Sequence, residues 1–317
     1  MTVSIIICTR NRAESLKPTL ESIGRAVVPP GWNAELIVVD NGSTDSTEAT
    51  VASMTWPNLP VRYMREERKG KGFAYNTGMG AALGQIFIFT DDDVRVPIDW
   101  IEGMGRPILD GKADAVAGGV GFPPDIAVAL AQPPFSSRRS WFASTEELNR
   151  EAPTRMVGAN MAFHRHVLDR VPGFDVELGP GALGFDDETL FSWQLLVAGY
   201  KLVGALDVVV EHHFDTSRLT EEGLIDLARK MGHSHAFVYY HWEHKKSRFA
   251  FPRLVLSCLY QHWVRFFDRT RGKKAGLATI EALQLEQNMA FYREYIVQCK
   301  RRHKYPLRGL APPTARV

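Results

Sequence analysis

The chain has 317 residues, of which 45% are apolar and 23% charged, and this composition excludes a disordered or fibrous protein. The net charge of +2 hides an uneven distribution. Residues 1–228 carry 20 Lys and Arg against 31 Asp and Glu, a net charge of −11, whereas residues 229–317 carry 18 against 5, a net charge of +13. The length predicts two domains, or one domain with a large appendage, and the charge divides the chain into an acidic body and a basic tail.

The cysteines and the apolar runs bear on the compartment. Three scattered cysteines, Cys8, Cys258 and Cys299, are too few for a disulfide framework or a Cys-rich zinc site and favour a reducing compartment. The N-terminus lacks the pattern of a signal peptide, and no apolar run approaches the roughly 18 residues that span a bilayer. We therefore expect a cytoplasmic protein, either free or bound peripherally at the inner face of the membrane.

Short apolar runs alternate with helical patterns in the first hundred residues. Runs that are apolar on both faces and alternate with helices indicate a parallel sheet covered by helices on both sides. Strands are expected at Val3–Cys8, Ala34–Val39, Val61–Met64 and Gln85–Thr90, and helices at Ser15–Ile23, Ser46–Met54 and Phe73–Leu83.

Beyond residue 100 the pattern is less regular. A strand at Ala115–Val120 is followed by a Pro-rich, partly irregular connection that runs to residue 157. Strands at Met156–His164 and Leu202–Glu211 flank a helix at Asp186–Tyr200, and from Thr220 the chain is helical and basic. We therefore expect an α/β fold with a mostly parallel sheet in residues 1–219, and a basic helical C-terminal region in residues 220–317.

Polar clusters follow three of the expected strands, at Thr9–Arg12, Asp40–Asp45 and Asp91–Asp93. In a parallel sheet, ligands bind beyond the carboxyl ends of the strands, so the three clusters favour one shared site. Loops are polar in any case, which is the alternative explanation. The Asp triplet is its most specific part, because three adjacent carboxylates repel one another unless a cation or strong donors are present. Mg²⁺ or Mn²⁺ suits such oxygen ligands, although a helix N-cap also favours Asp.

Together these motifs resemble those of a known family, the inverting family 2 glycosyltransferases, whose catalytic domain has the Rossmann-like GT-A fold. The resemblance covers roughly residues 3–215, about two thirds of the chain. It rests on Ile5–Arg12, Leu36–Asp45, Gly70–Asn76, the Asp triplet, Gly158–Phe163, Gly173–Asp175, and Asp187–Glu188 ahead of Ala198–Tyr200.

The resemblance implies a nucleotide-sugar donor and assigns residues to it. Asp40 corresponds to the carboxylate that reads the nucleotide base, and Thr9 and Arg12 line the base and ribose. Lys71, or alternatively Arg68, lies where the family contacts the base or the phosphates.

The resemblance also implies a divalent metal, Mn²⁺ or Mg²⁺, that bridges the two phosphates and stabilises the leaving group. Asp93 is the favoured metal ligand, Asp92 remains an alternative, and Asp91 is expected to contact the ribose. After the last strand, the pair His212 and His213 offers a third metal ligand or a diphosphate contact, for which we select His213. A purely structural histidine is the alternative.

An inverting transfer needs a carboxylate that takes the proton from the attacking hydroxyl. The family places this base in an acidic pair at the start of a helix. Counting back from Ala198–Tyr200 without a gap gives Asp187 and Glu188, whereas alignment on Leu190 gives Asp186 and Asp187. Because Asp187 belongs to both pairs, it is the predicted base. Acidic residues that complement the helix dipole are the alternative.

The predicted activity is therefore metal-assisted transfer of a sugar from a nucleoside-diphosphate sugar to a glycan or a lipid-linked acceptor. Acceptor recognition is assigned to Arg138–Trp141, Asn160 and Gly179–Gly184. One rival within the same fold is a nucleotidyltransferase, but the first strand-to-helix loop lacks its Gly-rich, Lys-containing signature. The other is a non-catalytic scaffold that binds nucleotide, nucleic acid or membrane. We expect no nucleic acid partner, since the carboxylates of the acidic body repel phosphates unless a metal is bound.

The basic tail allows two interpretations. Amphipathic helices on an anionic membrane are one, and a helical subdomain whose aromatic face packs on the body is the other. The apolar residues concerned are Leu254, Val255, Leu256, Leu259, Tyr260, Trp263, Phe266 and Phe267, interleaved with Arg253, Arg265, Arg269, Arg271, Lys273 and Lys274.

Overall fold

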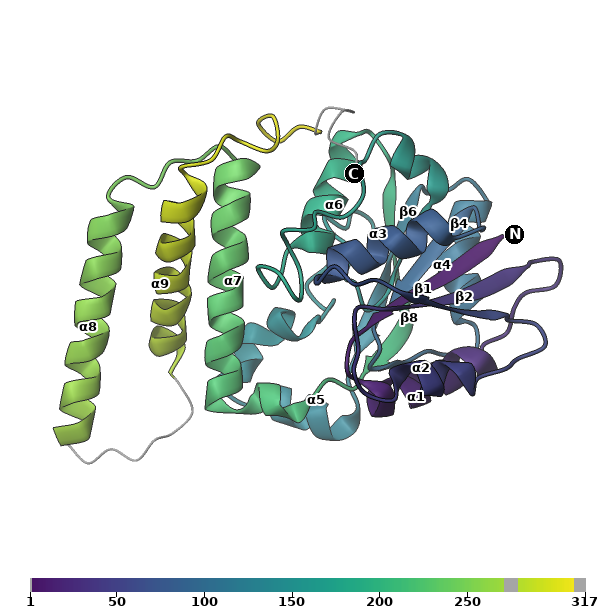
Figure 1. The fold of residues 1–317 in the computed structure, drawn as a ribbon, viewed down its shortest axis with the longest axis horizontal. Helices are drawn as coiled ribbons and strands as arrows, with labels where there is room; N and C mark the ends of the chain where they lie inside the picture. Colours follow the sequence, from purple (N-terminus) through teal and green to yellow (C-terminus); the bar gives the residue numbers. More distant parts are fainter. Residues whose placement is uncertain (1, 271–278, 311–317) are drawn as a thin grey trace.

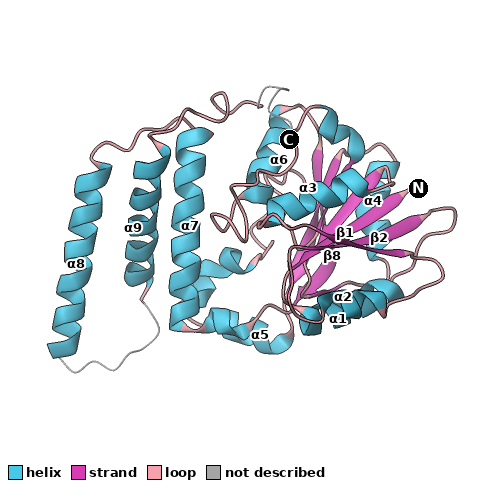
Figure 2. Cartoon of the chain, in the orientation of Figure 1, coloured by secondary structure: helices cyan, strands magenta, loops and turns pink. Residues whose placement is uncertain are grey.

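The computed structural model describes residues 2–270 and 279–310, with side chains given for all of these except 264–270. A central sheet is covered by helices on both faces, and three long helices stand to one side of it (Figures 1 and 2). The strands are β1 (Val3–Thr9), β2 (Ala34–Asp40), β3 (Val61–Arg65), β4 (Ile86–Thr90), β5 (Val94–Arg95), β6 (Ala115–Gly121), β7 (Met161–His164) and β8 (Leu202–His212). The helices are α1 (Ala13–Arg25), α2 (Thr47–Ala52), α3 (Lys71–Ala81), α4 (Trp100–Leu109), α5 (Pro124–Leu130), α6 (Asp187–Val197), α7 (Glu221–His241), α8 (Ala250–Thr270) and α9 (Ile280–Gln298), with short 3-10 helices η1 (Phe135–Phe142), η2 (Arg165–Asp169) and η3 (Thr216–Leu219).

The sheet has the strand order β3-β2-β1-β4-β7-β6-β8-β5 among the described residues. Four of its pairings are parallel, β3 with β2, β2 with β1, β1 with β4, and β6 with β8. Strand β7 runs antiparallel to both of its neighbours, and the short β5 runs antiparallel to β8. The predicted α/β class, with a mostly parallel sheet between helices, is thereby confirmed.

The two faces of the sheet carry separate cores, because successive residues of a strand point to opposite sides. Ile5 and Ile7 of β1 pack with α1, α2 and α4, whereas Ile6 packs with α3 and α6. All three side chains are fully buried. This explains why the strands read as continuous apolar runs and not as alternating ones.

The irregular middle of the chain differs most from expectation. Strand β7 begins at Met161 and not at Met156, because residues 156–160 form a turn closed by a hydrogen bond from Asn160 N to Val157 O. The helices α4, α5 and η1 were not predicted. Pro123 and Pro124 mark the start of α5, where a proline at the first helical position costs no hydrogen bond.

The C-terminal region consists of the helices α7, α8 and α9 in the part of the chain that the structure describes (Figure 1). Helix α7 packs on the body through Leu224 and Leu227, which share a cluster with Phe142 and Phe214. Helix α8 is the outermost element and lies beside α9 (Figure 1). The division into residues 1–219 and 220–317 stays a prediction.

Two further expectations concern this region. The side chains of Arg265, Phe266, Phe267 and Arg269, and the residues Arg271, Lys273 and Lys274, lie outside what the structure describes. Within the described residues, no helix combines the length and the apolarity needed to cross a membrane.

A cluster of polar contacts fastens the end of the chain to the body, and we call it the C-terminal clasp. Lys304 Nζ lies 2.7 Å from Asp175 Oδ1, and the hydroxyl of Tyr305 donates to Asp175 Oδ2. The Arg301 guanidinium donates two hydrogen bonds to the Glu177 carboxylate, from Nη1 at 2.6 Å and from Nη2 at 3.0 Å. Because Asp175 is buried, it depends on these donors, and the clasp fixes the loop that leads into α6.

Removal of the Tyr305 hydroxyl should therefore destabilise the fold. We expect Tyr305→Phe to lower the free energy of unfolding by about 2 kcal/mol, the range for a hydrogen bond to a charged group. Tyr200→Phe is the matched control, since the Tyr200 hydroxyl donates to the neutral carbonyl of His166 at 2.9 Å and should cost about 1 kcal/mol. Urea unfolding of both variants measures the difference, and equal losses would contradict the clasp.

Candidate active site

The loops after β1, β2 and β4 meet at one edge of the sheet. Parallel pairing sets Thr9 opposite Asp40 and Ile7 opposite Thr90, so β1 and β2 end at the same level and β4 ends two residues earlier. Thr9 Oγ1 donates to Asp92 Oδ2 at 2.7 Å, and the backbone N–H of Asn11 donates to Ser43 Oγ at 2.8 Å. The structure thus brings together the three polar clusters that the sequence singled out.

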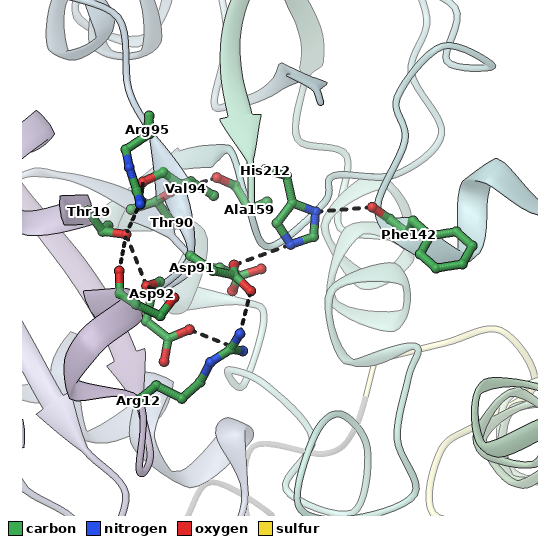
Figure 3. A network of polar contacts seen from close by, with 12 residues as sticks. Arg12, Thr19, Thr90, Asp91, Asp92, Val94, Arg95, Phe142, Ala159 and His212 are labelled. Atoms are coloured by element: carbon green, nitrogen blue, oxygen red, sulfur yellow. Dashed lines mark hydrogen bonds and ion pairs between the residues drawn. The ribbon is translucent and has the colours of Figure 1, made fainter. Parts of the chain in front are cut away.

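Two cationic side chains hold the Asp triplet together, and Figure 3 shows one of them, Arg12. The Arg12 guanidinium lies 3.4 Å from Asp92 and 2.9 Å from Asp93. From the other side, Lys71 Nζ lies 2.8 Å from Asp91 Oδ1 and 3.2 Å from Glu188 Oε1. Each cation therefore bridges two carboxylates, which reduces the repulsion among neighbouring negative charges.

His212, and not His213, completes this cluster. Its Nε2 lies 3.2 Å from Asp93 Oδ1, and its Nδ1 lies 3.1 Å from the carbonyl oxygen of Phe142 (Figure 3). A carbonyl only accepts, so Nδ1 carries a proton, and Nε2 is the ring nitrogen that faces Asp93. His213 turns away and lies 2.5 Å from Glu211. The selection of His213 as metal ligand is therefore corrected to His212.

The donor set of Asp91, Asp93 and His212 fits a divalent cation. One ligand atom from each residue lies within 4.8 Å of the others. Two carboxylates with one imidazole suit Mn²⁺ better than Mg²⁺, which prefers oxygen ligands alone. The carbonyl of Phe142 would also fix the orientation of the imidazole, as partners outside the ligand set do in metal sites.

The two inner carboxylates titrate differently. Burial, followed by the Asp93 charge, raises the pKa of Asp92 to about 7 against the opposing effect of Arg12. Burial also acts to raise the pKa of Asp93, but the hydrogen bond and charge of His212, together with Arg12, hold that pKa below its usual range. Of Asp92 and Asp93, Asp93 is therefore the carboxylate that is better suited to bind a cation at neutral pH.

A second acidic group opens helix α6. Asp186 occupies the left-handed region with φ +68°, a strained conformation for a residue other than glycine. It is followed by Asp187, whose side chain is buried, and by Glu188, which pairs with Lys71. Among the described residues, neither oxygen of Asp187 has a hydrogen-bond partner.

Asp187 and Glu188 are tightly packed, but their pKa values are shifted in opposite directions. Burial, followed by the neighbouring Glu188 charge, raises the pKa of Asp187 well above its ordinary value. Burial acts in the same direction on Glu188, but Lys71 reverses it and lowers the pKa of that carboxyl. Glycines make room for the pair, since a Cβ on Gly179 would lie 2.5 Å from Asp187 Oδ2 and one on Gly158 would lie 2.1 Å from Glu188 Oε1.

Both acidic groups line one cavity of about 1400 Å³. The sheet edge and α6 form one wall of the cavity, and the helices α7 and α9 form the opposite wall. Further cations face it from Arg10, Lys69, Arg155, Arg218 and Lys230. The facing wall is lined by Tyr239, Gln284, Gln287, Asn288, Phe291 and Tyr292.

Not all predicted site residues reach this cavity. Asn160 is fully buried behind it, where its amide donates to the carbonyls of Gly119 and Val208 and its Oδ1 accepts from Trp100 Nε1 at 2.9 Å. Its assignment to the acceptor is therefore replaced by a structural role. Asp40 is also buried, with its oxygens accepting from Ser43 N and from the Tyr63 hydroxyl, both at 2.7 Å.

Of the segment assigned to the acceptor, Ser140 and Trp141 line the cavity. Arg139 instead pairs with Glu146 at 2.5 Å, and the Arg138 guanidinium lies over the Trp141 ring. Arg68, the alternative to Lys71, pairs with Glu66 at 2.8 Å and does not line the cavity. Lys71 does line the cavity.

The cavity wall formed by α7 and α9 was not predicted from the sequence, because no motif marks it. A signal does exist, because the α9 residues that line the cavity recur at a spacing of three and four and therefore share one helix face. Amides and aromatics on one face of a helix with a weak apolar pattern could have indicated a polar cavity.

Residues 4–171, just over half of the chain, match the model of Glycosyl transferase family 2. The chain is 34% identical over 122 residues to glycosyltransferase AglE of Haloferax volcanii, covering 38% of the chain and 40% of that protein. It is 33% identical over 118 residues to dolichol-phosphate mannosyltransferase of Pyrococcus furiosus, covering 37% and 32%. The chain thus matches 40% or less of the length of these relatives.

Solved structures resemble the chain over a greater length. Mannosyltransferase PcManGT from Pyrobaculum calidifontis, in complex with GDP-Man and Mn²⁺, superposes with a TM-score of 0.56 at 21% identity, over 93% of this chain and 70% of that one. TarS 1-349 of S. aureus in complex with UDP gives a TM-score of 0.52 at 13% identity, over 97% and 94%. At these identities the likeness establishes the fold, and the expected GT-A fold is confirmed. With the family model, it shows that the chain belongs to glycosyl transferase family 2, a family of glycosyltransferase enzymes.

Proposed function

We propose that this chain transfers a sugar from a nucleoside-diphosphate sugar, with inversion at the anomeric carbon, to a hydroxyl of a glycan or a lipid-linked acceptor. The observation that carries the proposal is that one cavity joins a metal-ligand cluster to a buried carboxylate that accepts no hydrogen bond within the described residues. A volume of about 1400 Å³ exceeds the usual range for one small ligand and has room for a donor together with part of an acceptor. PcManGT, which holds GDP-Man and Mn²⁺, supports the donor class.

The donor is assigned to the sheet edge. Thr9 and Arg12 contact the base and ribose, and Lys71 contacts the diphosphate. Asp40 is the proposed reader of the base, a role that requires this buried carboxylate to become accessible from the cavity. The cations that face the cavity balance the phosphate charge, since Arg and Lys are the main phosphate partners in proteins.

Asp91, Asp93 and His212 are the proposed ligands of a divalent metal, with Asp92 linking Thr9 and Arg12 behind them. When bound, the metal neutralises charge on the leaving diphosphate. Arg12 and Lys71 hold the carboxylates at this edge in position before the donor arrives.

Asp187 is the proposed base. A general base works best when its pKa is close to the working pH, and burial moves the pKa of Asp187 in that direction. The Lys71 charge has the opposite effect on Glu188 and makes it a poor base. Asp187 takes the proton of the acceptor hydroxyl while the oxygen of that hydroxyl attacks the anomeric carbon. The bond between the sugar and the diphosphate breaks on the opposite face of the sugar.

The acceptor is assigned to the wall opposite the sheet edge. Trp141 and the loop 179–184 contribute from the body, and the amides and aromatics of α7 and α9 from the other side. Side-chain amides both donate and accept hydrogen bonds, and aromatic rings pack on apolar faces, a combination that suits a hydroxyl-rich ligand.

The base is tested by Asp187→Asn. A thermal-shift screen of nucleoside diphosphates and their sugars with Mn²⁺ first identifies the donor, which raises the melting temperature according to its occupancy. We then expect Asp187→Asn to lower the transfer rate by roughly 10² to 10⁴-fold and leave donor binding unchanged. Asp186→Asn is the matched neighbour and should keep most activity. If Asp186→Asn abolishes transfer and Asp187→Asn does not, the base is misassigned.

The pH dependence of transfer provides a second test. Asp187 works only when ionised, so kcat/KM should fall as the pH drops through the raised pKa of Asp187, at a higher pH than for an ordinary aspartate. Lys71 lowers that pKa, so Lys71→Met should move the acid limb to higher pH in addition to slowing the reaction. An acid limb that stays in place in Lys71→Met would contradict the assignment.

The metal site is tested by substitution of two proposed ligands, with the neighbouring His213 as the control position. We expect Asp93→Asn and His212→Gln to weaken Mn²⁺ binding in the presence of nucleoside diphosphate by at least about tenfold, the lower bound for changes at metal sites. His213→Gln is the control and should bind Mn²⁺ like the unchanged protein. Isothermal titration measures the three affinities, and a loss confined to His213→Gln would overturn the ligand set.

A further inference from the structure

Helix α8 carries an unusual density of exposed apolar side chains. Of the 18 large apolar residues that are exposed among the described side chains, seven lie between Phe249 and Trp263. Leu256 is 65% exposed and Leu259 is 61% exposed. Elsewhere the exposed apolar residues are scattered, and scattered residues need no explanation, whereas a contiguous patch indicates an interaction surface.

These side chains form a stripe on the side of α8 that faces away from the rest of the molecule. Leu256, Leu259, Tyr260 and Trp263 recur at a spacing of three and four and therefore share one helix face. The opposite face packs on α9, where Gln261 donates to Glu286 and the half-buried Leu254 and Cys258 lie. Figure 1 shows α8 as the last helix at this end of the molecule. We call the stripe, together with Phe249 and Phe251 at the start of the helix, the outer face of α8.

The charge along this face is predominantly positive. Between His244 and Trp263 the sequence contains Lys245, Lys246, Arg248 and Arg253 and no Asp or Glu. All four basic side chains are exposed; Lys245 pairs with Glu243 at 2.7 Å, which leaves Lys246, Arg248 and Arg253 to face a partner. A second copy of the chain that packed through the same face would bring two positive segments together, which opposes self-association. The charge favours an anionic partner instead.

We propose that the outer face of α8 docks on an anionic lipid surface, with the helix lying in the plane of the interface. Apolar side chains enter the boundary between headgroups and acyl chains, and Lys and Arg beside them contact the lipid phosphates. Tyr260 and Trp263 suit this boundary, since amphipathic aromatic rings are enriched there. From Ala250 to Trp263 the helix is about 21 Å long at 1.5 Å per residue, enough for about four turns to lie on the surface. The proposal is independent of the reaction assigned to the cavity.

The test is co-sedimentation of the full chain with two kinds of vesicle, one of phosphatidylcholine alone and one that also contains phosphatidylglycerol. We expect binding to the anionic vesicles, weaker binding at high salt, and little binding to the neutral ones. The double variant Leu256→Ser/Leu259→Ser should bind anionic vesicles at least about tenfold more weakly, because both leucines lose their apolar burial. Leu83→Ser/Val128→Ser is the matched control, as both residues are equally exposed but far from α8, and its binding should be unchanged.

The basic residues are tested separately. Lys246→Gln/Arg253→Gln should weaken binding to anionic vesicles by about 30-fold, the factor for about 1 kcal/mol per charge, and Lys17→Gln/Lys112→Gln should not. Light scattering in the absence of lipid tests the alternative partner for this face, which is a second copy of the chain. A dimer that Leu256→Ser/Leu259→Ser dissociates, equal binding to both kinds of vesicle, or no binding to either would each overturn the proposal. Sugar transfer measured on a water-soluble acceptor should be the same in all four variants, so a loss of activity is not mistaken for a loss of docking.

Discussion

The crowding of six carboxylates around one cavity is the constraint on which the rest of the site depends. Asp91–Asp93 end one strand and Asp186–Glu188 begin one helix, and unpaired buried charges of this kind cost several kcal/mol each. Within the described structure, His212 meets Asp93, and two cations each bridge a pair of the carboxylates: Arg12 bridges Asp92 and Asp93, and Lys71 bridges Asp91 and Glu188. These cations hold the groups in place but leave negative charge on the cavity wall. A bound cation therefore completes the site and does not disturb it.

Much of this arrangement could be predicted from the sequence, because parallel strands that end together bring their following loops together. Thr9, Arg12 and the Asp triplet were found in this way. The sequence could not tell whether His212 or His213 faces the site, since this depends on which side chains of β8 point to that side of the sheet. That strand pairs with β6 through a register shift between Gly118 and Gly119, so simple alternation along the sequence does not tell which histidine faces the site.

Asn160 and the α7 and α9 wall illustrate a second limit. Asn160 lies in a segment shared with the family, but its amide is used to join Gly119 and Val208 and the indole of Trp100 inside the fold. A buried amide with this many partners is recognised only once those partners are placed. The wall likewise depends on how α9 packs against α7, which is a tertiary contact that no local pattern of Gln284, Gln287 and Asn288 encodes.

Helix α9 connects the two proposals physically. One of its faces lines the cavity through Gln287, Asn288 and Phe291, and it also supports α8, whose outer face is apolar and basic. A protein that rested on a membrane through α8 would hold the acceptor wall of the cavity one helix away from the lipid surface. That arrangement favours an acceptor whose sugar or phosphate end projects from the membrane, because only the reacting end has to enter the cavity. The clasp at Asp175 keeps the loop before α6, and with it Asp187, in a fixed position relative to the same helices.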